Sequence, residues 1–322
     1  MGSRAAAPGM LPPMHSSVSG EQFELRHGPH RAVVTEVGAT LRVCELSGYR
    51  VLDGSGLDSL TLAARGQVLA PWPNRIDGGR YEWAGVEEQL ALTEPLRGNA
   101  IHGLVRWAPF SVAELTDSRV TMAAGVFPQM GYPFSLRLRV SYELDDRGLA
   151  VSTAVSNVGP TSAPWGLGFH PYLTAGSDHI DGDVLTVPAH AVIATNDRLI
   201  PTGDRLPVAE TPFDFRTGRV IGDVAHTSMD TCFTDVQRDQ DGLAWVTLSS
   251  PTSGRTVCVW MDEQFPYVML VTGDFLPAAL ARRSLAIEPM TCPANAFPTG
   301  EGLVTLAPGE SWTARWGVAL RT

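Results

Sequence analysis

The stretch SLRLRVSYEL, residues 135–144, alternates polar and apolar side chains without a break. Strict alternation puts every second residue on one face of an extended chain, which is typical of a β-strand with one buried face. The turn sequence DDRG follows, and LAVSTAVSNV alternates again from residue 149. The two runs predict an antiparallel hairpin. The apolar residues expected on one face of its first strand are Leu136, Leu138, Val140, Tyr142 and Leu144.

The same pattern recurs along the chain, at 31–46, 244–261 and 311–320. Helical periodicity is rare: residues 275–283 form one short candidate and residues 57–66 a weak one. The sequence has 32 glycines and 24 prolines, which punctuate many short runs. These features predict an all-β fold, a large antiparallel β-sandwich whose loops close its ends.

The domain organisation predicted is simple. Residues 1–20 contain several prolines and no continuous apolar core, so we expect a disordered tail and not a secretory signal. Residues 21–322 show no linker and no repeat, so we expect one domain. Without an export signal or an 18-residue apolar run, a cytoplasmic protein is expected. The four cysteines form no C-x-x-C pair and are expected to be buried thiols.

The charged residues exclude several classes of protein. The formal net charge is −10, which disfavours binding to nucleic acid or to a membrane surface. All 24 basic residues are arginines. Without lysine, the chain has no Schiff-base residue, no pyridoxal-phosphate lysine and no P-loop lysine.

Five segments break the strand pattern by placing polar groups beside aromatic residues and prolines. Taken singly, each polar residue has an ordinary explanation: a surface cation for Arg75, a hydrogen-bonded histidine for His102, a turn former for Asp230. Each segment alone is therefore a weak signal. The segments are APWPNRIDGGRYEWAG (70–85), GNAIHGLVRW (98–107), GFHPYL (168–173), SMDTCFTD (228–235) and AIEPMTCPANAF (286–297).

Cofactor and metal motifs are absent from the sequence. It has neither H-E-x-x-H nor C-x-x-C, no G-x-S-x-G elbow, and no G-x-G-x-x-G after a strand. We therefore expect no metal and no cofactor. A metal site assembled across strands from His102, His170 and Asp230 stays open, because spacing alone does not exclude it.

The motifs PNRI, IHGLVR, HPYL, MDTCF and EPMTCPANAF, in this order on an all-β chain, resemble those of the aldose 1-epimerase (galactose mutarotase) family. The resemblance covers nearly everything after the tail and implies the family's supersandwich fold. Two segments differ. The best-known family members continue the histidine segment with an aromatic residue and an asparagine, whereas Pro171-Tyr172-Leu173 follow His170 here, and EPMTCPANAF is a divergent version of its segment. The sugar therefore stays unspecified.

The resemblance implies roles for individual residues. His170 matches the family's general acid and Glu288 its general base. Arg75, His102 and Asp230 match residues that bind the sugar, and Asn74 and Tyr172 are expected to join them. Trp72, Tyr172 and Phe233 could pack on a pyranose or simply in the core.

The chemistry suits such a pair. Exchange of anomers needs a proton removed from the anomeric hydroxyl and one delivered to the ring oxygen. If close together, Glu288 and His170 are expected to favour each other's ionised forms. The implied function is an aldose 1-epimerase acting on a free aldohexose, as a monomer or homodimer with a sugar as its small-molecule partner. Two alternatives stay open: a hexose-6-phosphate 1-epimerase using Arg106 or the arginines of 281–283, and a non-catalytic sugar-binding protein.

Overall fold

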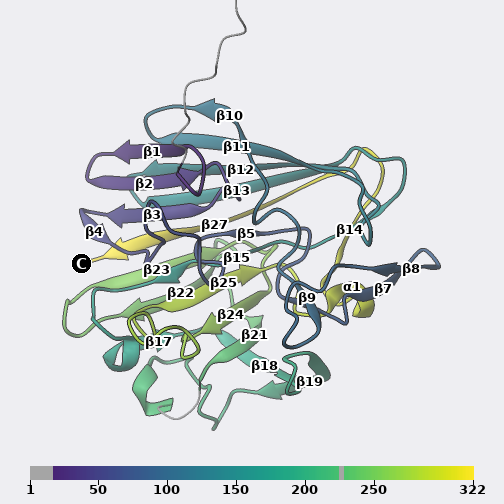
Figure 1. The fold of residues 1–322 in the computed structure, drawn as a ribbon. Coiled ribbons are helices and arrows are strands. Elements are labelled where there is room, and N and C mark those ends of the chain that lie inside the picture. The colour runs from purple at the N-terminus through teal and green to yellow at the C-terminus, as the bar shows by residue number, and fades with distance from the viewer. Residues whose placement is uncertain (1–16, 225–227) are drawn as a thin grey trace, which may run out of the picture.

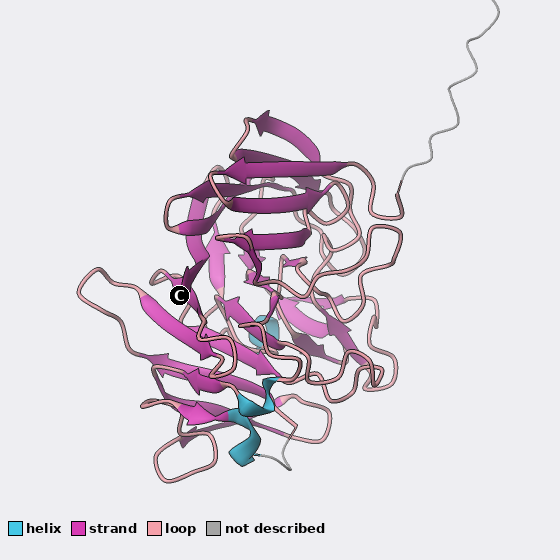
Figure 2. Cartoon of the chain, turned by 90° about the vertical axis from the view of Figure 1, so that its left-hand side faces the viewer, coloured by secondary structure: helices cyan, strands magenta, loops and turns pink. Residues whose placement is uncertain are grey.

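The computed structural model describes residues 17–224 and 228–322. Most of the tail predicted for residues 1–20 lies outside the described residues. Two large antiparallel sheets dominate the described part of the chain (Figure 1), which confirms the predicted all-β sandwich. Strands and loops make up almost the whole fold, with only short helical segments (Figure 2).

The first large sheet has nine strands, and the hairpin predicted from residues 135–158 lies in it. The two strands of that hairpin pair in register, with Leu136 opposite Asn157 and Asp145 opposite Gly148, and the alternate apolar residues of the first strand are buried, which confirms the prediction. In spatial order the nine strands are β10 (Ser111–Leu115), β11 (Arg119–Val126), β12 (Leu136–Asp145), β13 (Gly148–Asn157), β27 (Ser311–Arg321), β23 (Thr256–Met261), β22 (Ala244–Ser249), β17 (Val184–Thr186) and β20 (Arg219–Val220).

The second large sheet has eight strands and carries most of the predicted site. Its order is β19 (Pro201–Pro207), β18 (Ala189–Thr195), β21 (Asp230–Val236), β24 (Tyr267–Val271), β25 (Leu285–Met290), β15 (Gly168–Phe169) and β5 (Val68–Leu69), and β16 (Tyr172–Leu173) also pairs with β25.

Smaller elements complete the described structure. A four-stranded sheet is formed by β1 (Gln22–His27), β2 (His30–Thr35), β3 (Leu41–Leu46) and β4 (Tyr49–Arg50). Two-stranded sheets join β14 (Ala163–Trp165) to β26 (Val304–Leu306), β6 (Arg75–Asp77) to β9 (Asn99–Ile101), and β7 (Arg80–Trp83) to β8 (Val86–Gln89). The helical segments are α1 (Ala296–Thr299), η1 (Ile180–Gly182) and η2 (Ile221–Val224).

Both helix candidates from the sequence are wrong. Residues 275–283 form turns, in which the N–H groups of Leu280 and Ala281 both donate to the carbonyl of Pro277. A single turn is costly to form alone, and nothing extends it here. In residues 57–66, Ala63 and Ala64 have φ angles of 52° and 55°, in the left-handed region, which a right-handed helix does not allow.

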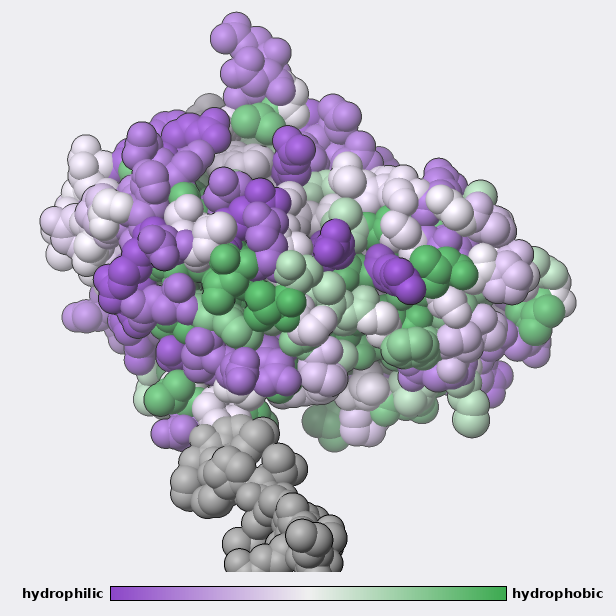
Figure 3. Space-filling model, turned by 90° about the horizontal axis from the view of Figure 1, so that it is seen from above, coloured by the Kyte–Doolittle hydropathy of each residue, from purple (hydrophilic) through white to green (hydrophobic). Residues whose placement is uncertain are grey.

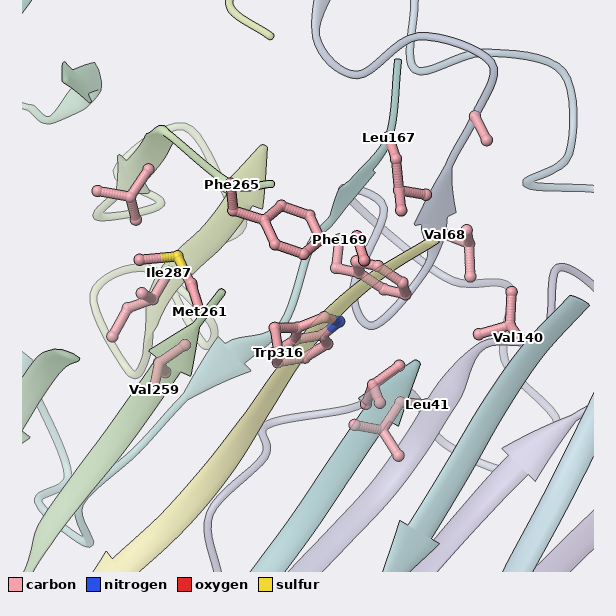
Figure 4. Close-up of a cluster of buried hydrophobic side chains, with 14 of the residues drawn as sticks. Leu41, Val68, Val140, Leu167, Phe169, Val259, Met261, Phe265, Ile287 and Trp316 are labelled. Atoms are coloured by element: carbon pink, nitrogen blue, oxygen red, sulfur yellow. The ribbon is translucent and has the colours of Figure 1, made fainter. Parts of the chain in front are cut away.

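The apolar core lies between the large sheets and determines which side chains face the site. The ring centroids of Phe169 on β15 and Trp316 on β27 are 5.0 Å apart (Figure 4). Successive residues of a strand face opposite ways, so Phe169 and Ile287 point into this core. Their neighbours His170 and Glu288 therefore point to the other face of the eight-stranded sheet.

The surface is mixed in character, and the cysteines fit the sequence prediction. Seen from above, apolar side chains lie in small groups among polar ones (Figure 3). All four cysteines are buried and free, as expected. In the described ranges, no helix is both long and apolar enough to cross a membrane.

Candidate active site

Strand pairing brings His170 opposite Glu288. Gly168 pairs with Met290, and Tyr172 pairs with Ala286, so His170 falls midway, across from Glu288. The N–H of Ile287 donates to the carbonyl of Pro171 and keeps this register across the break between β15 and β16. As a result, Nε2 of His170 lies 3.1 Å from Oε1 of Glu288. Two groups 118 positions apart in sequence thus meet at hydrogen-bond distance.

Both members of this pair are buried. The side chains of His170 and Glu288 are 7% and 1% exposed. Burial lowers the pKa of His170 to about 3 and raises the pKa of Glu288 well above its usual range. The expectation that proximity would favour both ionised forms is therefore wrong, because desolvation outweighs the attraction between the two charges. Burial therefore favours a protonated carboxyl and a neutral imidazole, a form in which the two groups together hold one proton.

His102 is fixed by reciprocal contacts with Asn74. The N–H of His102 donates to the carbonyl of Asn74 (2.9 Å), and the N–H of Asn74 donates to Nδ1 of His102 (3.2 Å). Both residues have φ near 60°, a conformation that asparagine adopts more easily than most residues. Burial lowers the pKa of His102 well below its usual value. Since Nδ1 accepts a hydrogen bond, the proton of this neutral ring is on Nε2, which is a donor.

Arg75 lies in the same region and is held by acidic residues. Its Nε and Nη2 atoms lie 2.9 and 3.0 Å from the two carboxylate oxygens of Glu94, and its Nη2 lies 3.7 Å from Oδ2 of Asp230. Asn74 adds an acceptor, Oδ1, at 3.3 Å from Nη1. Burial raises the pKa of Asp230. The guanidinium is therefore oriented before any ligand arrives.

A pocket extends this group of residues across the eight-stranded sheet. Met269 pairs with Glu288 and with Cys232 on its other side, so the pocket and the His170–Glu288 pair are neighbours on one face. The lining residues are Asn74, Arg75, Ile193, Thr195, Leu199, Pro201, Asp230, Cys232, Met269, Pro293 and Ala294. Its lining combines the polar side chains of Asn74, Arg75, Thr195 and Asp230 with apolar ones.

The aromatic residues named from the sequence lie deeper than the pocket. The ring of Tyr172 stacks on that of His170 and lies against the guanidinium of Arg65, and the whole side chain is buried. Trp72 packs against Phe297, and Phe233 packs in the core. The candidate metal ligands do not form a metal centre either: the described ranges contain no group of three or more His, Cys, Asp or Glu residues placed to hold an ion.

Glu94 and Arg65 were missed by the sequence analysis. The carboxylate of Glu94 accepts hydrogen bonds from the side chains of Arg75, Arg97 and Asn99. The guanidinium of Arg65 makes a cation–π contact with Tyr172. Neither lies in a motif, and a single charged residue in a loop gives no signal in sequence.

The family model described as "Aldose 1-epimerase" matches residues 21–318. The chain belongs to the aldose 1-epimerase family. An uncharacterized protein of Escherichia coli K12, YihR, is 35% identical to this family member over 293 residues, 91% of each chain.

Other relatives are more distant. Human galactose mutarotase is 29% identical over 70% of this chain and 66% of its own length. Among solved structures, a mutarotase/aldose epimerase homologue from C. elegans superposes with a TM-score of 0.84 at 21% identity, covering 94% of this chain and 98% of the other. A galactose mutarotase-like protein from Clostridium acetobutylicum gives 0.80 at 18% identity, covering 93% and 94%. These structures support the supersandwich fold of this epimerase family member.

Proposed function

We propose that this protein is an aldose 1-epimerase that interconverts the α and β anomers of a free aldohexose. The observation that carries the proposal is the His170–Glu288 pair, at 3.1 Å and beside a pocket with polar groups. The similarity to galactose mutarotases supports the choice of a hexose. The proposed site needs no cofactor, and a cytoplasmic location suits a free sugar substrate.

The proposed reaction balances within the pair. Glu288 as carboxylate takes the proton of the anomeric hydroxyl, the bond from C1 to the ring oxygen breaks, and its electron pair goes to that oxygen. His170 as imidazolium protonates the ring oxygen, leaving an open-chain aldehyde. After rotation about the C1–C2 bond, the reverse transfers close the ring on the other face.

The pair holds one proton before and after ring opening, and only its position changes. The carboxylate–imidazolium form precedes ring opening, and the carboxyl–imidazole form follows it. Burial, which favours the second form, thus favours the arrangement that accompanies the open chain. A pair of constant net charge suits a buried site, where creating a new charge is costly.

Sugar binding is assigned to the groups around the pair. Nε2–H of His102 and the guanidinium of Arg75 donate to sugar oxygens, and Asp230 accepts from hydroxyl groups. Asn74 sets the position of both donors, and the hydroxyl of Tyr172 has no partner among the described residues. A buried hydroxyl without a partner suits a polar ligand.

The phosphate alternative has less support. Arg282 is paired with Asp181 and Asp274, and Arg283 is paired with Asp53, so neither offers an uncommitted charge. Arg106, the other arginine considered for a phosphate, is half-buried, and burial lowers its pKa. A non-catalytic role would not require an acid beside a base. Polarimetry with α-glucose, α-galactose and their 6-phosphates, after subtraction of spontaneous mutarotation, tests all three. Acceleration with the free sugars is expected, and its absence with every sugar would contradict the proposal.

A further inference from the structure

A column of ring contacts joins Arg65, Tyr172, His170 and His102. The ring of His170 lies parallel to that of Tyr172, with the centroids 5.1 Å apart at 14°. The guanidinium carbon of Arg65 lies 4.4 Å from the centroid of Tyr172. The ring of His102 meets that of His170 edge-on at 5.5 Å and 80°. The His170–Tyr172 contact is aromatic stacking and the Arg65–Tyr172 contact is a cation–π interaction, and both are attractive.

The orientation of His170 depends on this column to an unusual degree. Functional histidines commonly have their tautomer and ring plane fixed by a hydrogen bond at the second ring nitrogen. Nδ1 of His170 is buried and has no such partner among the described residues. Apart from the contact with Glu288, its ring plane is therefore set by packing against Tyr172 and His102.

Arg65 is anchored firmly behind Tyr172. It is 3% exposed, and its Nη1 donates to Oδ2 of Asp53 at 2.8 Å and to the carbonyl of Asp53 at 2.9 Å. The N–H of Asp53 donates in turn to the carbonyl of Tyr172 at 2.8 Å. Ser284, one residue before Leu285 of β25, also donates to Asp53. Arg65, Tyr172 and the strand of Glu288 thus share one buried anchor.

The ion pair with Asp53 does not by itself explain why Arg65 is buried. Nε and Nη2 of Arg65 are buried without a partner in the described part of the chain, which costs free energy. The guanidinium also lies over the ring of Tyr172, with its central carbon 4.4 Å from the ring centroid. We propose that Arg65 is a positioning residue for His170: by clamping Tyr172 from behind, it holds the imidazole in the plane that meets Glu288.

This inference rests on the proposed role of His170 as proton donor. It also has an electrostatic consequence, because a fixed cation in the column disfavours the imidazolium. Removal of the Arg65 charge is expected to raise the pKa of His170. The charged and titratable groups near the ring of His170 are Glu288, Tyr172, His102, Arg65, Arg75 and Arg106.

The test compares Arg65→Met with Arg283→Met. Both variants remove one arginine that binds Asp53, but the side chain of Arg283 is 36% exposed, and it pairs with the other oxygen of that carboxylate. For Arg65→Met we expect kcat to fall about tenfold or more, since a misplaced group can cost up to about a hundredfold. KM should change less than kcat, and Arg283→Met should keep both. Arg65→Lys, which keeps the charge without the planar group, should also lose kcat.

A readout that does not depend on turnover completes the test. The ring signals of His170, assigned by comparison with His170→Asn, are followed by NMR across pH. In Arg65→Met they should move and titrate at higher pH, while Arg283→Met leaves them unchanged.

If Arg65→Met does not fold, Tyr172→Leu, which keeps the Arg65–Asp53 contact, should disturb the same signals. A folded Arg65→Met with normal kcat and unchanged signals would overturn the inference. If the wild type turned over no aldose, the proposed function would fail, yet the NMR comparison would still decide the role of Arg65.

Discussion

Nε2 of His170 and Oε1 of Glu288 lie 3.1 Å apart on adjacent strands, and both side chains are almost completely buried. Burial changes the chemistry of this contact. In water such a pair would be an imidazolium and a carboxylate; here desolvation lowers the pKa of one and raises the pKa of the other. The two groups are therefore best treated as one coupled pair that shares a proton.

The first prediction concerns the pH dependence of kcat/KM. Below the lowered pKa of His170 the pair gains a second proton, and Glu288 has no free site to accept one. Above the raised pKa of Glu288 the pair has lost its proton, and His170 has none to donate. A broad plateau is therefore expected, whose acidic limb lies far below 6.5, toward the pKa of His170 at about 3. Initial rates measured by polarimetry from acid to alkaline pH check this, and an acidic limb near 6.5 would count against a desolvated histidine.

The second prediction concerns Glu94. Its carboxylate receives Nε and Nη2 of Arg75, so Glu94→Gln should release the guanidinium from its orientation. A hydrogen bond between charged groups contributes about 1.5–3 kcal/mol, so we expect KM for the sugar to rise about tenfold or more, with a smaller change in kcat. The measurement is a full rate curve against sugar concentration.

A matched control for Glu94→Gln is Arg97→Gln. Arg97 binds the same carboxylate, but its side chain is 43% exposed, and such pairs contribute little. Its kinetics should stay close to those of the wild type. If the two substitutions had equal effects, Glu94 would act only by holding its own loop in place and not by orienting Arg75.

The third prediction concerns stability. Folding raises the pKa of Glu288, so the protonated carboxyl stabilises the fold fully below its unfolded pKa, and that contribution is lost as pH rises through the folded pKa. The amide of Glu288→Gln does not titrate, so this variant lacks the pH-dependent contribution to stability. Its Tm should therefore gain on that of the wild type as pH rises above 4.5, the ordinary pKa of a glutamate, as followed by thermal melts in a series of buffers.

The opposite sign applies to His170. Folding lowers its pKa, so the neutral ring is compatible with the fold above 6.5, and stability is lost as pH falls from 6.5 toward the folded pKa of about 3. His170→Asn should gain on the wild type as pH falls in that window. A pH-independent difference in Tm for both variants would contradict the desolvated pair.

The sequence predicted some parts of this structure and missed others for physical reasons. Alternation identified the hairpin at 135–158, because the period of two is a property of the extended chain itself. Helices were wrongly expected at 275–283 and 57–66, where side-chain pattern did not reveal isolated turns and left-handed alanines.

Some residues of the candidate site were predicted from the sequence, and others were missed. His170, Glu288 and Arg75 stood in recognisable motifs, and the fold brings them together. Glu94 and Arg65 act by contacts between loops and strands distant in sequence, which no local pattern encodes. Likewise, the protonation of the pair depends on burial, which became visible only with the packing of the two strands.

The central claim is that Glu288 and His170 carry the protons of the reaction. Glu288→Gln keeps the size of the side chain but cannot accept a proton usefully, and His170→Asn cannot deliver one. Each positioned proton carrier is worth about 10²–10⁴-fold in rate, so each variant should lose about 10²-fold or more in kcat. The double variant should be little worse than either single one, because an acid and a base acting in one step work as a unit.

Turnover of folded Glu288→Gln at saturating sugar is the most direct measurement. A thermal melt confirms the fold, and polarimetry, corrected for spontaneous mutarotation, gives kcat. The account predicts a loss of about 10²-fold or more with KM little changed. Near-normal turnover in the folded variant would contradict it.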